Sequence, residues 1–324
     1  MAQPTGAFST YDSPVATGGG REDLSDVIYD ISPTETPFIS AAKKGKATGV
    51  NHEWLEDSLT AAADNKAIEG NDASPSAPSD RVRLGNYSQI LTKHAVVTGT
   101  QEVVLKGGGI KSEMAYQVAR RMKEMKRDLE YGILGLDNAK VAGNDSTARE
   151  FGSLSSYLGT QTSSFQDGGS GATGPTGNGN DIITGTLTPA AFSEAKLITG
   201  LEALWERSSA DNILMFSGKK QRSIVSTFTA SSTRHVTTDN RKLVASIDVY
   251  DGDFQTVTVM PDRYCIPSKV FLVDPEYVKI CDLRPIAKSD LAVTGDSERK
   301  QIVWETTLEV CNRAAHHQIA NLLT

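Results

Sequence analysis

Few residues of this chain stand at a spacing that could carry out chemistry. The run Gly107-Gly108-Gly109-Ile110-Lys111-Ser112 has the glycines and the lysine of a phosphate-binding loop, in which backbone N–H groups surround the phosphate oxygens. In that motif a glycine directly precedes the lysine, whereas Ile110 holds the position here. We therefore interpret the run as a glycine break that opens a helix.

Two histidines and three cysteines are the candidate metal ligands. His316 and His317 are adjacent, so their side chains point in different directions in a helix or a strand, whereas one ion needs ligands on a common face. We expect a surface or interface pair. Cys265, Cys281 and Cys311 lack the Cys-x2-Cys spacing of zinc sites, which indicates reduced thiols of a protein made in cytoplasm. We predict no metal and no cofactor.

No motif for covalent catalysis is present in the sequence. The Gly-x-Ser-x-Gly turn of many hydrolases is absent, and no pair of carboxylates stands out. A hydrolase that uses the glycine-rich run 167–180 as a lid is an alternative, but it would need a nucleophile motif. We predict that the protein is not an enzyme.

Composition narrows the class of protein. The chain has 324 residues, of which 38% are apolar and 23% charged, as is ordinary for a globular protein. A net charge of −7 argues against a protein that wraps nucleic acid, but it allows one that encloses nucleic acid. No apolar run approaches the roughly 20 residues that span a bilayer, and residues 1–20 lack the apolar core of a secretory signal. We expect no membrane contact.

The N-terminal region predicts an arm without a core of its own. After a polar tail of about twenty residues, one face of a short helical segment carries Leu24, Val27, Ile28 and Ile31. Thr36-Pro37 then begins a second helix, with Thr36 as N-cap, that runs from Phe38 to about Lys44. Two short helices separated by Ser32-Pro33 need another surface to cover them.

Two strands with a long polar connection follow. Residues 50–56, with Trp54 on one face, and residues 81–98 read as strands, and the connection 61–80 offers little that could form a core. The first strand ends with the acidic Glu53, Glu56 and Asp57, and the second begins with the basic Arg81 and Arg83. Antiparallel pairing would bring these charges together, each pair contributing about 0.2–1 kcal/mol. We predict an extended hairpin with a mobile tip.

The strongest helix signal covers residues 111–134. Its apolar seam, at spacings of three and four, consists of Met114, Val118, Met122, Met125, Leu129 and Ile133. The opposite face is basic, with Arg120, Arg121, Lys123, Lys126 and Arg127 among acidic residues. This face is either a solvated mixture of charges, which we favour, or a surface that faces enclosed nucleic acid and neutralises phosphates without reading sequence.

The rest of the chain predicts short elements. Residues 135–186 read as loop, Thr188-Pro189 begins a helix, and residues 218–228 are a second helix. Strands are expected at 211–216, 256–260, 270–273, 277–281 and 302–310.

The last of these strands alternates clearly. Trp304 and Leu308 fall on one face, and we expect both to be buried against the helix seam near Met122, Met125 or Leu129. Glu305 falls on the opposite face. Its replacement by alanine is therefore expected to be mild.

Several short segments, in this order, resemble tailed-phage major capsid proteins with the HK97-type fold, the family typified by podophage major head proteins. The segments are Ile31–Ile39, Asn51–Leu59, Val257–Pro261, Phe271–Tyr277, Cys281–Pro285 and Leu291–Leu322. The resemblance covers roughly residues 21–323. It implies an α+β subunit with an N-terminal arm (1–46), an extended hairpin loop (47–100), a peripheral domain (101–207 and 291–324) with a spine helix at 111–134, and an axial domain (208–290).

The resemblance implies a structural protein of the virion. Copies would form pentamers and hexamers of an icosahedral head, assembled in the bacterial cytoplasm around double-stranded DNA. Only about twenty residues precede the arm, which implies a separate scaffolding protein or a mature chain without its pro-segment. A portal and a decoration protein are further implied partners. An encapsulin-like compartment of the same fold, with a protein cargo, is the alternative.

The resemblance also suggests which residues meet other molecules. Subunit contacts are expected at Ile28, Ile31, Phe38, Trp54, Lys66, Arg81 and Arg83. Contacts with the lumen or its DNA are expected at Arg120, Arg121, Lys123 and Arg127. The covalent lysine–asparagine cross-link of some relatives would need a hairpin lysine, and Lys66 is available.

Overall fold

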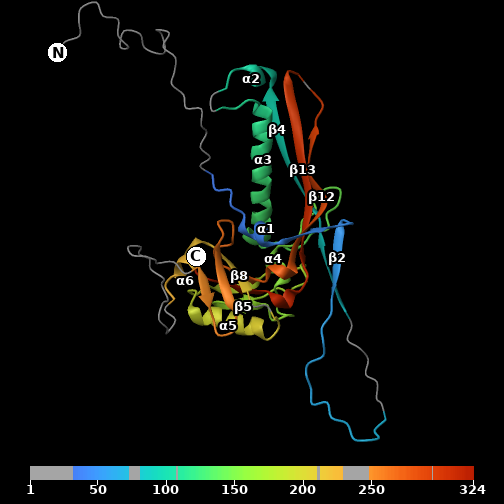
Figure 1. Ribbon diagram of the computed structural model, residues 1–324, viewed down its shortest axis with the longest axis vertical. Coiled ribbons are helices and arrows are strands. Elements are labelled where there is room, and N and C mark those ends of the chain that lie inside the picture. Colours follow the sequence, from blue (N-terminus) through green and yellow to red (C-terminus); the bar gives the residue numbers. More distant parts are fainter. Residues whose placement is uncertain (1–31, 73–80, 107–108, 210–211, 229–247, 294) are drawn as a thin grey trace, which may run out of the picture.

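The chain folds into an elongated body with a long helix and long strands at one end and a compact unit of helices and strands at the other (Figure 1). The computed structural model describes residues 32–324, apart from 73–80, 107–108, 210–211, 229–247 and 294. The predicted helical segment around Ile28 and Ile31 lies outside the described residues. Mixed helices and strands confirm the α+β class.

A four-stranded sheet forms the elongated part. Its strands, in spatial order, are β1 (Lys43–Lys46), β12 (Val278–Asp290), β13 (Ser297–Val310) and β4 (Gln89–Thr98). The strand β1 pairs parallel with β12, and the other pairs are antiparallel. The longest strands, β12 and β13, form a ribbon that runs beside the long helix (Figure 1).

The long helix α3 (Glu113–Glu130) covers this sheet, and a π-helical turn (Tyr131–Gly135) continues it. The Ser112 hydroxyl accepts a hydrogen bond from the Ala115 N–H and caps the helix. The predicted seam is confirmed, because Met114, Val118, Met125 and Leu129 are buried in one core with strand β13. The helix thus begins with its Ser112 cap, shortly after the glycine run, as expected if the glycines are a break that opens the helix and not a phosphate-binding loop.

A six-stranded sheet forms the compact unit. Its strands, in spatial order, are β5 (Phe165–Asp167), β14 (His317–Ala320), β11 (Val270–Val273), β8 (Asn212–Ser217), β10 (Thr256–Pro261) and β9 (Val249–Asp251). Helices α5 (Glu194–Trp205) and α6 (Lys219–Val225) pack on this sheet in a second core. Short 3-10 turns at 275–277 and 313–315 lead into β12 and β14.

Two ribbons and three short helices complete the fold. The ribbons are β2 (Asn51–Glu56) with β3 (Val82–Tyr87), and β6 (Ser170–Thr173) with β7 (Thr184–Thr188). The helices are α1 (Pro37–Ala41), α2 (Gly99–Val103) and α4 (Leu154–Tyr157). The ribbon of β2 and β3 points away from the body, at the opposite end from α2 (Figure 1).

The predicted domain boundaries do not follow the cores. Helix α5, which we predicted in the peripheral domain, packs in the second core with β8 and β10. Strand β12, which we predicted in the axial domain, pairs along its length with β13. Likewise, the predicted strand 81–98 is two strands, because β3 pairs with β2 whereas β4 pairs with β13. The chain crosses between the two units more than once, so domains defined as stretches of sequence do not match the two cores.

Three local predictions were wrong at their boundaries. The arm helix ends at Ala41, since Lys43–Lys46 pairs with β12 as a strand. The helix α5 begins after Ser193 rather than at Thr188-Pro189, since Thr188 ends β7. The region predicted as loop contains residues 151–159, which are buried throughout and contribute apolar side chains to the first core.

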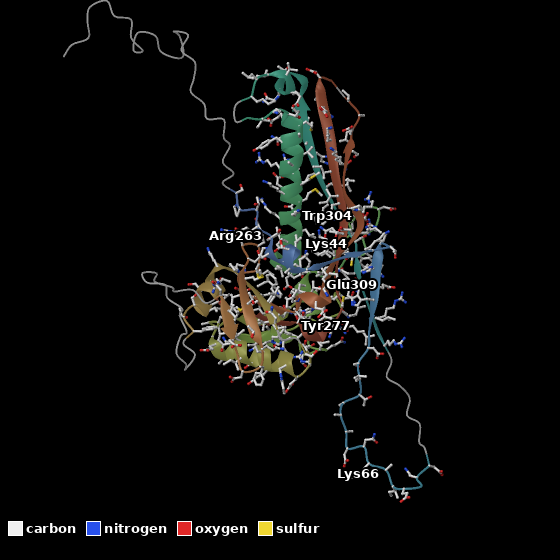
Figure 2. All side chains as sticks on the ribbon, viewed as in Figure 1. Lys44, Lys66, Arg263, Tyr277, Trp304 and Glu309 are labelled. Carbon is white, nitrogen blue, oxygen red and sulfur yellow. The ribbon has the colours of Figure 1, made fainter. Side chains whose placement is uncertain are left out.

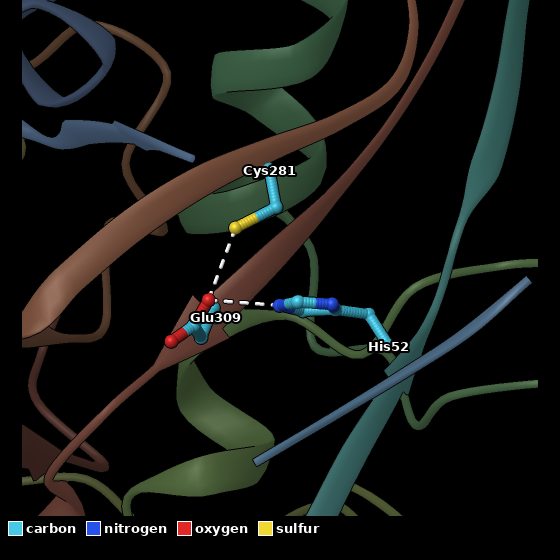
Figure 3. A group of neighbouring side chains, drawn as sticks. All are labelled: His52, Cys281 and Glu309. Carbon is cyan, nitrogen blue, oxygen red and sulfur yellow. Dashed lines mark hydrogen bonds and ion pairs between the residues drawn. The ribbon is translucent and has the colours of Figure 1, made fainter. Parts of the chain in front are cut away.

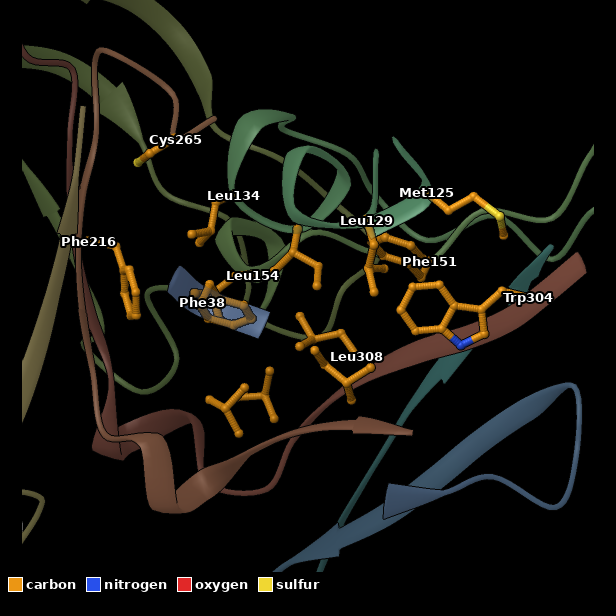
Figure 4. Packing of buried hydrophobic residues seen from close by; sticks show 14 of the residues in the cluster. Phe38, Met125, Leu129, Leu134, Phe151, Leu154, Phe216, Cys265, Trp304 and Leu308 are labelled. Carbon is orange, nitrogen blue, oxygen red and sulfur yellow. The ribbon is translucent and has the colours of Figure 1, made fainter. Parts of the chain in front are cut away.

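In strand β13 and the residues after it, the structure confirms one prediction, for Trp304 and Leu308, and contradicts two, for Glu305 and the adjacent histidines. Trp304 and Leu308 are buried in the core that contains Met125 and Leu129 (Figure 4). Glu305 is also buried, because from residue 304 onward both faces of β13 are covered. A mild Glu305→Ala substitution is therefore no longer expected.

The two adjacent histidines are likewise not a surface pair. His316 and His317 are both buried, and burial lowers the pKa of each imidazole to about 3. The backbone N–H of Asp274 donates a hydrogen bond to Nδ1 of His316. These neutral side chains belong to the interior beside β11 and β14.

Candidate assembly surfaces

The hairpin of β2 and β3 carries the predicted charge pairs. Arg83 donates a hydrogen bond from Nε to Oε2 of Glu53 at 2.8 Å, and Nε of Arg81 lies 3.4 Å from Oδ2 of Asp57. The pairing of opposite charges across the ribbon is thus confirmed. Both arginines remain largely exposed, so each pair contributes little to stability.

Beyond the paired strands, the described residues 57–72 of the hairpin have no contact that would cover their apolar side chains. Residues 57–72 are all exposed, and Leu59 and Ile68 expose 98% and 83% of their surface. Lys66, at the far end in Figure 2, is exposed and pairs with Asp64 at 2.6 Å. A segment this extended, with apolar side chains in solvent, is typical of a surface that another chain covers.

The root of the hairpin is fixed to its own subunit. The Glu56 carboxylate accepts hydrogen bonds from the backbone N–H and Nε of Arg313 at 3.0 and 2.9 Å. The ring of Trp54, a predicted subunit contact, lies 5.9 Å from that of Tyr157 in the first core. The hairpin therefore leaves the body in a defined direction.

The described part of the arm is also anchored internally. Phe38, another predicted subunit contact, is buried and its ring lies 5.4 Å from that of Phe216. The carboxylate of Glu130, at the end of α3, accepts hydrogen bonds from the backbone N–H groups of Phe38 and Ile39 at 2.7 and 2.9 Å. This carboxylate satisfies the free N–H groups at the start of α1, where Thr36 makes no side-chain cap.

The Glu130 contact should make the stability of the subunit depend on pH. Burial raises the pKa of this carboxyl from 4.5 to about 7, and nearby Asp262 adds to the rise. The folded chain then binds a proton that the unfolded chain releases between these pH values, so stability falls as pH rises through this interval. We expect Glu130→Gln to remove up to about 3 kcal/mol of this pH dependence.

The measurement is urea unfolding of the unassembled subunit at several values between about pH 5 and pH 8. The buried His316 and His317 contribute equally to both proteins, so the free energy of unfolding of the wild type minus that of the variant should fall as pH rises through this range. Glu113→Gln, a change at the other end of the same helix, is the matched control and should keep the wild-type slope. Equal slopes for wild type and Glu130→Gln would contradict the prediction.

The basic face of the spine helix is a mixture of paired and free charges. Arg120 and Arg121 both contact Glu124, at 3.5 and 2.7 Å, and Lys123 is exposed. Arg127 is half-buried. This arrangement fits the solvated face that we favoured, and contact with enclosed nucleic acid stays a prediction.

A second exposed apolar group, which we did not predict, lies at the far end of the spine. Val103 ends helix α2, Leu105 follows it, and Val293 lies in the turn between β12 and β13. They expose 87%, 88% and 73% of their surface. The signal was available, because Val103-Val104-Leu105 is an apolar run shortly before a glycine break. The subunit thus has exposed apolar residues at two opposite ends.

A family model described as SU10 major capsid protein matches residues 3–323. The chain belongs to this family. It is therefore a phage major capsid protein, a structural subunit of the capsid shell, and this favours the phage shell over the encapsulin-like alternative. Among the described residues, no helix is long and apolar enough to cross a membrane.

Individual relatives agree with the family. The major capsid protein of Escherichia phage Phieco32 is 33% identical over 135 residues, which are 41% of this chain and 37% of that relative. This capsid protein therefore matches well under half the length of its curated relative.

Solved structures confirm the HK97-type fold. A chain of the cyanophage A-1(L) capsid superposes with a TM-score of 0.68 at 12% identity, over 98% of this chain and all of that one. A chain of the native GTA particle capsid gives 0.62 at 12% identity, over 96% and 99%.

Proposed function

We propose that this capsid subunit builds an icosahedral head of pentamers and hexamers by laying its hairpin over a neighbouring subunit. The observation that carries the proposal is the exposed hairpin, with Leu59 and Ile68 in solvent while its root is fixed by Glu56 and Arg313. A fixed root and an uncovered tip favour a contact with a second copy, and head-to-tail contacts of this kind close into rings.

The head would enclose double-stranded DNA without reading its sequence. Support comes from the basic residues of the spine helix, of which Lys123 is exposed. They would face the lumen and neutralise phosphates, which gives salt-dependent contacts without base recognition. A scaffolding protein, a portal and a decoration protein would assist assembly in the bacterial cytoplasm. No catalytic step is part of this function.

The test is assembly of the purified protein, followed by sedimentation and electron microscopy. We expect closed particles or five- and six-membered rings. Particles from infected cells should contain DNA, whereas an enzyme as cargo would favour the encapsulin-like alternative. A protein that stays monomeric at every salt concentration, with and without a scaffolding protein, would overturn the proposal.

A further inference from the structure

Three side chains that could bind a metal ion meet where the root of the hairpin crosses the four-stranded sheet (Figure 3). His52 comes from β2, Cys281 from β12 and Glu309 from β13. Their ligand atoms all lie within 4.8 Å of one another. Because His52 and Glu309 are 257 residues apart in the sequence, no spacing motif could have indicated the cluster.

The histidine and the cysteine converge on one oxygen of the glutamate. Nε2 of His52 lies 2.8 Å and Sγ of Cys281 lies 3.1 Å from Oε2 of Glu309. The other oxygen, Oε1, lies 3.1 Å from Sγ of Cys311 and 3.2 Å from Nζ of Lys279. Tetrahedral zinc, with bonds of about 2.0–2.3 Å, places its ligand atoms roughly 3 to 4 Å apart, so small side-chain movements would fit an ion between these donors.

The thiol of Cys281 is held in place by the backbone around it. Cys281 is 1% exposed and stands opposite Gly45 in the pairing of β1 with β12. A Cβ atom at residue 45 would lie 2.5 Å from the Cys281 sulfur, so the sulfur occupies space that only a glycine leaves open. The side chains of His52 and Glu309 keep 16% and 12% exposure, which leaves a path for an ion from solvent.

We propose that His52, Cys281 and Glu309 bind a zinc-like divalent ion, with Cys311 as the fourth ligand after rotation of its side chain. A thiolate, an imidazole and a carboxylate form a donor set that suits zinc and does not suit magnesium or calcium. On binding, the Cys281 and Cys311 thiols each release a proton to solvent and form a sulfur–metal bond, and the ion keeps its charge. The ion ties the hairpin root to β12 and β13.

The probe is Co²⁺, whose bonds to thiolates absorb in the near ultraviolet, followed by competition with Zn²⁺. Untagged full-length subunit is first treated with a chelator and then titrated. We expect one ion per chain and a thiolate band that Zn²⁺, but not Mg²⁺, removes. Cys281→Ser removes one of the two thiolates and should lose at least about half of the band, and His52→Gln should weaken binding at least about tenfold.

The control is Cys265→Ser, because Cys265 is a buried thiol outside the cluster and its loss should leave the titration unchanged. His52 lies on the half-exposed hairpin, so His52→Gln should fold normally, which circular dichroism can verify. A titration without a thiolate band overturns the proposal. So does binding that is equal in wild type, His52→Gln and Cys281→Ser, and the cluster is then a hydrogen-bonded ion-pair network only.

Discussion

Trp304→Ala should give unfolded or insoluble subunits. The Trp304 ring is buried in the first core beside Met125 and Leu129, and its Nε1 donates a hydrogen bond to Oδ1 of Asp282 at 2.7 Å (Figure 4). Truncation of a buried tryptophan costs about 3–5 kcal/mol, a large part of the roughly 5–15 kcal/mol by which a domain is stable. Solubility and urea unfolding of the expressed subunit measure the effect.

Two further substitutions on the same strand make the test specific. Glu298 is exposed, so Glu298→Ala should change the free energy of unfolding by less than about 0.5 kcal/mol. Glu305→Ala should be harmful, because the buried carboxylate contacts Arg149 and Arg284 at 2.7 and 2.6 Å and both would lose their partner. A soluble Trp304→Ala protein that assembles normally would show that the ring adds little to the core.

Removal of the hairpin tip should abolish shells and leave the subunit folded. Replacing residues 58–80 by a short glycine-serine turn keeps the pairing of β2 with β3 and the contact of Glu56 with Arg313. The described residues of the tip make no contact with either core, so the free energy of unfolding should stay within about 1 kcal/mol of wild type. Electron microscopy should show no closed particles.

A milder pair of variants identifies the cause. Leu59→Ser with Ile68→Ser removes the two exposed apolar side chains of the tip, and Asn65→Ser with Asn71→Ser is the matched polar control. We expect the first pair to reduce the yield of particles at least about tenfold and the second to leave it unchanged. Normal shells from the tip deletion, or an unfolded subunit, would contradict the role of the tip.

The elements with regular spacing could be predicted from the sequence. The seam of α3 repeats every three or four residues over five turns, and the charges of the hairpin lie at matching positions of two strands. The buried segment 151–159 could not be predicted, because Phe151-Gly-Ser-Leu-Ser-Ser-Tyr-Leu-Gly159 has no period and the partners of Ser153 and Ser155 lie outside the segment. Ser155, for example, donates a hydrogen bond to Gln318, 163 residues away.

The candidate sites also divide into features that the local sequence predicts and features that depend on distant residues. The exposed tip follows from its polar composition, whereas the Glu130 cap and the cluster of His52, Cys281 and Glu309 join residues that are about 90 to 260 positions apart. Phe38 is buried in the first core and Trp54 packs against it, on residues from later in the chain, and contact of either with another subunit stays a prediction. Local patterns identify faces of elements, and they do not identify which distant element covers a face.

The placement of exposed apolar residues at opposite ends of the subunit has a consequence for how the amount of shell depends on protein concentration. When unlike ends meet, each bound subunit still offers an unsatisfied end to the next one, so a pair is no more complete than a single subunit. Additions are equivalent until the assembly closes into rings and a shell, where a subunit gains several contacts at once, so closed particles form cooperatively above a critical concentration. Below that concentration subunits should stay free, and above it every added subunit should enter particles while the free concentration remains constant.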